Sequence, residues 1–123
     1  MRRRAVGSVR VVDGVVSELT ITPVSGGLSL SGEIDGRTAP ELKASVTRYL
    51  TSSSELRLDM ANVTFMDSSG LRVLLAARMT ARDDGGDLVL SNLSTAVVRV
   101  LRLSKLDGEF EVVDEPGDHP PSA

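Results

Sequence analysis

Residues 64–71, Thr-Phe-Met-Asp-Ser-Ser-Gly-Leu, join a segment with strand periodicity to one with helix periodicity. Apolar and polar residues alternate over 56–61, and an apolar, helix-forming run follows over 71–81. Ser68 and Ser69 therefore stand where a strand gives way to a helix. Because a helix N-terminus carries unpaired N–H groups and a positive dipole end, a serine there can cap the helix, and a phosphate is well accommodated.

The rest of the chain alternates strand and helix patterns. Strands are expected over 9–12, 15–22, 28–34, 55–61, 88–90 and 110–113, and helices over 38–50, 71–81 and from Ser94 onward. The order, about β-β-α-β-α-β-α-β, predicts an α/β domain with a mixed or largely parallel sheet flanked by helices.

Two helix starts carry capping signals. Thr38 is a candidate N-cap, with Pro40 in the first turn and Glu41 three residues on to complete a capping box. Ser94 is the candidate cap of the third helix, and Gly85-Gly86 follows the second.

A chain of 123 residues is expected to form one domain. We assign residues 15–114 to that domain and residues 1–14 to an N-terminal extension, partly flexible, that can add a strand through a hairpin at Asp13-Gly14. The Pro-rich residues 115–123 are expected to form a disordered tail.

Composition argues against several functions. There is no cysteine, the net charge is -3 and aromatic residues make up 2% of the chain. Nucleic-acid binding is therefore not expected, because it favours a basic face and stacking aromatics. No apolar run approaches the roughly 20 residues of a membrane span, and the N-terminus lacks the apolar core of a signal peptide. We expect a cytoplasmic protein without a membrane partner.

Enzymatic chemistry lacks its usual groups. The only histidine is His119, in the tail, so a hydrolase built on Ser68 has no base. The chain has neither the phosphate-binding loop of NTPases nor a His/Cys metal cluster. The acids 83, 84 and 87 lack the spacing of a calcium loop. We expect no catalytic residue, metal or cofactor.

One pair of carboxylates is a candidate site for metal binding or acid/base chemistry. Asp35 and Asp67 each end a predicted strand, so they would share one sheet edge if those strands are neighbours. Such a pair could bind magnesium or act in acid/base chemistry. Acids at strand ends are also ordinary turn and N-cap residues, and the residues alone favour that interpretation.

Ser68 and Ser69 have three interpretations: helix cap, nucleophile without a base, and phosphoacceptor. The last needs only an exposed hydroxyl, because another protein supplies ATP and the catalytic groups. Composition does not separate capping from phosphorylation, and the short pattern alone favours capping.

Two motifs, in the right order, change that balance. Residues 65–71, Phe-Met-Asp-Ser-Ser-Gly-Leu, resemble the phosphorylation-site signature of STAS domains, specifically of anti-sigma factor antagonists of the SpoIIAA/RsbV type. Residues 30–35 resemble the family's second-strand motif, and 38–42 the start of its first helix. The glycine pair 85–86 and the strand 88–90 follow at the family's spacing, so the resemblance spans about 15–114.

The resemblance implies a non-enzymatic regulatory protein. Its unphosphorylated form would bind an anti-sigma factor that is also a serine kinase, releasing a sigma factor to activate transcription. Phosphorylation would end that binding, and a PP2C-type phosphatase would reverse it. The acceptor corresponds to Ser68, with Ser69 as the lesser candidate and as a cap of the helix. The implied partner-binding residues are Asp35, Asp67, Ser68, Ser69, Gly70, Leu71 and Arg72.

An alternative stays within the fold. A STAS domain can also serve as a scaffold or subunit of another complex, stressosome-like or for lipid transport, without sigma-factor control. The extension 1–14 leaves self-association open.

Overall fold

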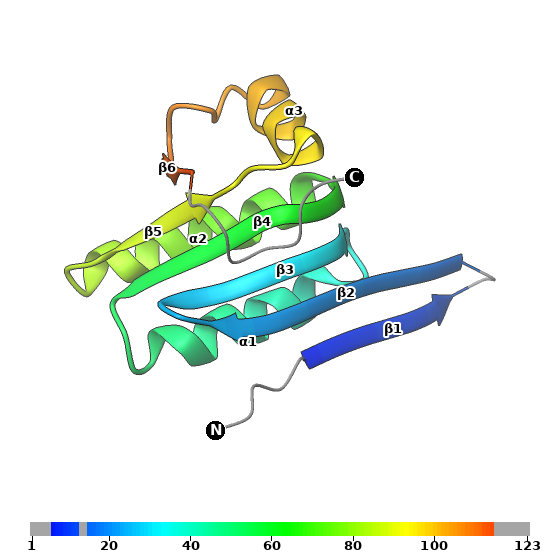
Figure 1. Ribbon diagram of the computed structural model, residues 1–123, viewed down its shortest axis with the longest axis horizontal. Helices are drawn as coiled ribbons and strands as arrows, with labels where there is room; N and C mark the ends of the chain where they lie inside the picture. The colour runs from blue at the N-terminus through cyan, green and yellow to red at the C-terminus, as the bar shows by residue number, and fades with distance from the viewer. Residues whose placement is uncertain (1–5, 13–14, 115–123) are drawn as a thin grey trace.

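A computed structural model describes residues 6–12 and 15–114. Within these ranges, strands and helices alternate after an initial run of strands (Figure 1). The elements are β1 (Val6–Val12), β2 (Val15–Val24), β3 (Gly27–Ile34), α1 (Ala39–Leu50), β4 (Glu55–Met66), α2 (Ser68–Asp83), β5 (Asp87–Ser91), α3 (Thr95–Leu103) and β6 (Glu111–Val113).

From β2 onward the order is β-β-α-β-α-β-α-β, which confirms the predicted fold class. β1 lies in the segment assigned to the N-terminal extension and pairs antiparallel with β2. The Asp13-Gly14 link, His119 and the predicted tail 115–123 lie outside the described residues.

The sheet is mixed and its strands lie in sequence order, from β1 at one edge to β6 at the other (Figure 1). The pairs β1–β2 and β2–β3 are antiparallel, whereas β3–β4, β4–β5 and β5–β6 are parallel. Each parallel connection passes through one helix, as parallel pairing requires. The carboxyl ends of β3 and β4 therefore meet at one edge of the sheet.

The helices α1 and α2 lie side by side behind the sheet in Figure 1, and α3 packs against β4. The core between them is built from aliphatic residues of β2 to β5 and the inner faces of the helices. The strand β5 is buried over 88–90, as its wholly apolar sequence predicts. In the part of the chain that the structure describes, no helix is both long and apolar enough to cross a bilayer.

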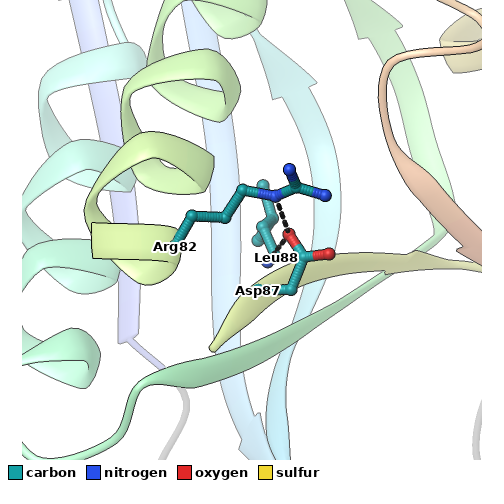
Figure 2. A network of polar contacts seen from close by, with 3 residues as sticks. All are labelled: Arg82, Asp87 and Leu88. Atoms are coloured by element: carbon teal, nitrogen blue, oxygen red, sulfur yellow. Dashed lines mark hydrogen bonds and ion pairs between the residues drawn. The ribbon is translucent and has the colours of Figure 1, made fainter. Parts of the chain in front are cut away.

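The second helix ends in a tight turn fixed by glycine and by an ion pair. Gly85 has a φ of +88°, which favours glycine, and the Gly86 N–H donates to the Ala81 carbonyl at 2.9 Å. Beyond the turn, Arg82 Nε lies 3.3 Å from an Asp87 carboxylate oxygen, and the Leu88 N–H donates to the same carboxylate at 2.8 Å (Figure 2).

These contacts set the acidity of Asp87. Burial alone would raise the pKa of Asp87, but hydrogen bonds from Arg82 and Leu88 and the positive charges of Arg82 and Arg78 together lower it. Asp87 thus orders the turn after α2 through its arginine partner.

Candidate functional site

The site forms where β4 passes into α2. Ser68 is the first residue of α2 and its side chain is exposed, whereas Ser69 is half-buried. Asp67 precedes them with extended backbone angles (φ −121°, ψ −169°), and its carboxylate accepts a hydrogen bond from the Ser69 N–H at 2.8 Å. Asp67 is therefore the N-cap.

The prediction that Ser69 caps the helix is wrong. Ser69 is the second helical residue, and its N–H is the group that the cap satisfies. A capping side chain must stand before the first helical turn, where its oxygen can reach the free N–H groups that follow. Ser68 also lies inside α2, so its hydroxyl is not committed to capping.

Asp67 also satisfies the next two backbone donors of α2. Its carbonyl accepts the N–H of Gly70 at 3.1 Å and that of Leu71 at 3.3 Å. The bond from Leu71 is the first regular i→i−4 bond of the helix, whereas the Ser69 and Gly70 N–H groups would otherwise be free. Two of the donors that make a helix N-terminus attractive to anions are thus used internally.

Asp35 and Asp67 directly follow the ends of the neighbouring strands β3 and β4, as predicted. Ile34 is the register partner of Met66, and the Asp67 N–H donates to the Ile34 carbonyl at 3.2 Å. The two acids therefore leave neighbouring parallel strands at the same edge. The Asp35 carboxylate accepts the N–H of Arg37 at 2.9 Å and that of Thr38 at 3.2 Å.

Thr38 is buried and joins β3 to α1. Its hydroxyl donates to the Glu33 carbonyl at 2.8 Å and accepts the Asp35 N–H at 3.0 Å. The predicted capping box with Glu41 is wrong: Thr38 makes no side-chain cap hydrogen bond. The reason is its backbone, which is already helical (φ −100°, ψ −17°) instead of extended, so its hydroxyl faces back to the strand end.

These contacts give both acids a structural use. Asp67 caps α2 and Asp35 closes the turn before α1. This agrees with the interpretation of the two acids as turn and N-cap residues. Among the described residues, no group of three acid, histidine or cysteine side chains is arranged to hold a metal.

Gly70 holds the start of α2 against the sheet. A Cβ atom at this position would lie 2.7 Å from Met66 Cγ and 2.8 Å from Ile34 Cγ2. Gly36, in the turn after β3, faces the same region, and its Cβ would lie 3.7 Å from Ser69 Oγ. The two turns thus approach closely, and the missing side chain of Gly70 allows that approach.

The predicted site residues fall into three groups by exposure. Gly70 and Leu71 are buried, so their side of the helix supports the site from beneath. Arg72, one helical turn after Ser68, is exposed. Asp35, Asp67 and Ser69 are half-buried at the rim.

Phe65 is an exposed aromatic residue near the site that sequence reasoning did not single out. It lies near the end of β4, opposite Glu33 in register, and is 47% exposed. Its neighbour Met66 is buried toward Gly70, so Phe65 points to the opposite face of the sheet. The available signal was the alternation of the strand, because Phe65 falls out of phase with the buried residue beside it.

Comparison with known proteins assigns the chain to a family. The family described as "Mlab, STAS domain" matches residues 17–114, and the chain belongs to the STAS domain family. The chain is 33% identical over 90 residues to an anti-sigma-B factor antagonist of Listeria monocytogenes, covering 72% of this chain and 79% of that protein. It is 32% identical over 87 residues to an anti-sigma-B factor antagonist of Bacillus subtilis, covering 71% and 77%.

A solved structure agrees with this assignment. The crystal structure of an anti-sigma factor antagonist from Mycobacterium paratuberculosis superposes with a TM-score of 0.65 at 28% identity, covering 94% of this chain and 88% of that one. The resemblance therefore extends from the two sequence motifs to the whole described fold.

Proposed function

We propose that this chain is an anti-sigma factor antagonist, a binding protein without catalytic activity. Its unphosphorylated form binds an anti-sigma factor and so releases a sigma factor to activate transcription. The names of the two relatives at 33% and 32% identity support this role. Such a role places the protein in the cytoplasm, where sigma factors meet RNA polymerase.

The switch is phosphorylation of Ser68 by the anti-sigma factor acting as a serine kinase. The observation that carries this proposal is the exposed Ser68 at a helix start that is capped by its neighbour Asp67, which leaves the Ser68 hydroxyl out of the cap. A kinase can reach this hydroxyl without opening the domain. A PP2C-type phosphatase would return the protein to its binding form.

Phosphorylation opposes binding through charge. A phosphate adds about -1.5 to -2 charges at neutral pH, next to Asp67 and at the edge that also carries Asp35. A partner surface that is acidic or apolar would meet a more negative and more strongly hydrated site. Like-charge contact and desolvation both cost free energy in an interface.

Phe65 and Arg72 give the unphosphorylated site its contact groups. Both are exposed: Arg72 lies on α2 four residues after Ser68, and Phe65 lies near the end of β4 three residues before it, on the other face of the sheet. Aromatic residues and arginine are enriched in interface cores, because they offer large contact areas and several donors. We infer that they lie in the interface with the anti-sigma factor, together with the rim residues Asp35, Asp67 and Ser69.

The phosphorylation proposal is tested with candidate anti-sigma kinases and ATP, followed by mass-spectrometric mapping of the phosphosite. The expected product carries one phosphate on Ser68. The Ser68→Ala variant should accept none, whereas Ser69→Ala should still be modified. Phosphate on Ser69, or no phosphate with any kinase that binds the protein, contradicts the assignment.

The binding proposal is tested by calorimetry with the kinase that modifies the protein. Ser68→Ala should bind as wild type does, and Ser68→Asp at least about tenfold more weakly, because an acid is placed in the interface. Ser25→Asp is the matched control, since Ser25 is exposed in the β2–β3 turn at the opposite end of β3 from Asp35. Equal affinity of Ser68→Asp and Ser25→Asp would refute the electrostatic account.

A second candidate function is a subunit of another complex, such as a stressosome-like scaffold or a lipid-transport assembly. The description of the matched family as "Mlab, STAS domain" supports this second candidate, because it does not mention sigma factors. Affinity capture from the native organism separates the two: an anti-sigma partner with a kinase-type ATPase domain supports the first function. A transporter subunit or a multi-copy STAS scaffold in its place supports the second.

A further inference from the structure

Ser68 and Arg72 lie on the same face of α2. They are four residues apart in the helix, a spacing that brings Cβ atoms within about 5–6 Å. Both side chains are exposed. Because helical side chains lean toward the N-terminus, the common rotamers of Arg72 bring its guanidinium within reach of Ser68.

Arg72 has no acid within one turn of it on α2, whose one acidic residue is Asp83 at the far end. The first turn of α2 contains no acidic residue. Among the described residues, the side chain of Arg72 makes neither an ion pair nor a hydrogen bond. This contrasts with Arg82 at the other end of the same helix, which pairs with Asp87.

The backbone of α2 offers a phosphate little compensation. The N–H groups of residues 69–71 all donate to Asp67, at 2.8, 3.1 and 3.3 Å. The carboxylates of Asp67 and Asp35 add negative charge at the same edge. A phosphate on Ser68 therefore needs a side-chain cation, and Arg72 is the cation that helix geometry directs to it. Arg37, in the turn after β3, is a further cation near this edge.

We propose that Arg72 is the counter-ion of the phosphate on Ser68, and that phosphorylation withdraws this arginine from the partner. The inference rests on the proposed phosphorylation of Ser68. In the unphosphorylated form, the Arg72 guanidinium is available to a carboxylate of the partner. In the phosphorylated form, it binds the phosphate through its planar set of N–H donors. The modification thus both adds negative charge and removes a positive contact.

The test uses full-length protein in which phosphoserine is encoded genetically at position 68, so that no kinase is needed. The second ionisation of phosphoserine, normally near pH 6, is followed by 31P NMR. A neighbouring cation favours the dianion and lowers this pKa, so Arg72→Ala should raise it by about 0.3–0.7 pH units. Arg72→Lys should restore part of the difference, because it keeps the charge but loses the bidentate geometry.

Arg99→Ala is the matched control, since Arg99 is an exposed arginine in the middle of α3. It removes the same unit charge from a helix surface away from the site. The proposal is overturned if Arg72→Ala leaves the phosphoserine pKa within 0.1 pH unit of the parent, or if Arg99→Ala moves it as far.

A double-mutant cycle gives an independent readout. The four proteins carry either serine or phosphoserine at position 68, each with and without Arg72→Ala. The effect of phosphorylation on the unfolding equilibrium constant in urea is measured with and without Arg72→Ala, and the ratio of the two effects is the coupling. We expect a favourable coupling of about two- to fivefold, and no coupling when Arg99→Ala replaces Arg72→Ala. Because the phosphate is installed during translation, failure of the kinase assay would leave this result intact, and absence of coupling would leave the kinase assay intact.

Discussion

Gly70→Ala is the sharpest perturbation of the site, because it adds one carbon atom where α2 meets the sheet. The new Cβ would lie 2.7 Å from Met66 Cγ and 2.8 Å from Ile34 Cγ2. Both neighbours are buried, and the methyl group of Ile34 is fixed by its β-branched side chain. Neither contact can be relieved by moving the end of a flexible surface side chain.

Two opposing effects determine how much Gly70→Ala changes the free energy of unfolding. Alanine is better than glycine inside a helix by about 0.5–1 kcal/mol. Overpacking of a well-packed core costs about 1–3 kcal/mol. Because the added carbon would overlap two buried side chains, the packing term dominates, and we expect Gly70→Ala to lower the free energy of unfolding by about 1–2 kcal/mol.

Urea denaturation followed by circular dichroism measures this difference. With a slope of about 1–3 kcal/mol per M of urea for a small domain, the midpoint should fall by about 0.3–2 M. Gly36→Ala is the matched control, because Gly36 has no positive φ and its Cβ would meet Ser69 Oγ at an ordinary 3.7 Å. It should leave stability unchanged or raise it slightly. A Gly70→Ala protein as stable as wild type would refute the packing argument.

Three further variants test the turns around the site and the turn after α2. Asp67→Ala removes the cap bond to the Ser69 N–H and should cost about 1 kcal/mol in urea denaturation, whereas Asp67→Ser should retain most of the stability. Thr38→Val leaves the partly buried Glu33 carbonyl and Asp35 N–H without their hydroxyl partner and should cost about 1–3 kcal/mol in the same assay. Asp87→Asn should cost up to about 1 kcal/mol near neutral pH, because Asp87 and Arg82 are 25% and 55% exposed. Since folding lowers the pKa of Asp87, its contribution is present above the unfolded pKa of about 3.9 and is lost as the pH falls through the folded value. The difference between wild type and Asp87→Asn should therefore shrink in denaturation curves recorded from pH 5 down to pH 3.

Much of the fold was predictable because burial in a sheet requires a recognisable pattern of apolar residues. The alternation of Leu56, Leu58 and Met60 marks β4, and the unbroken apolar run 88–90 marks a strand covered on both faces. The side-by-side position of Asp35 and Asp67 followed from parallel pairing of the strands that precede them. These features depend on periodicity, which short-range sequence patterns report well.

The capping contacts were less predictable, because they depend on where strand pairing stops. Three consecutive residues, 67–69, can all cap a helix. Pairing of Met66 with Ile34 carries β4 up to residue 66, which leaves Asp67 as the last residue before α2. Thr38 shows the same effect, since its hydroxyl donates to the end of β3 instead of capping α1. The local sequence pattern does not predict which of two competing contacts forms.

The committed amides of α2 have a consequence for the speed of the switch. Asp67 already satisfies the N–H groups of residues 69–71, and Gly70 seats the helix on Ile34 and Met66. If Ser68 is phosphorylated as proposed, adding or removing the phosphate would need to break none of these backbone bonds. Both forms would then share one scaffold, and resetting the protein would involve no refolding step. The response time would be set by the modifying enzymes and by dissociation of the partner.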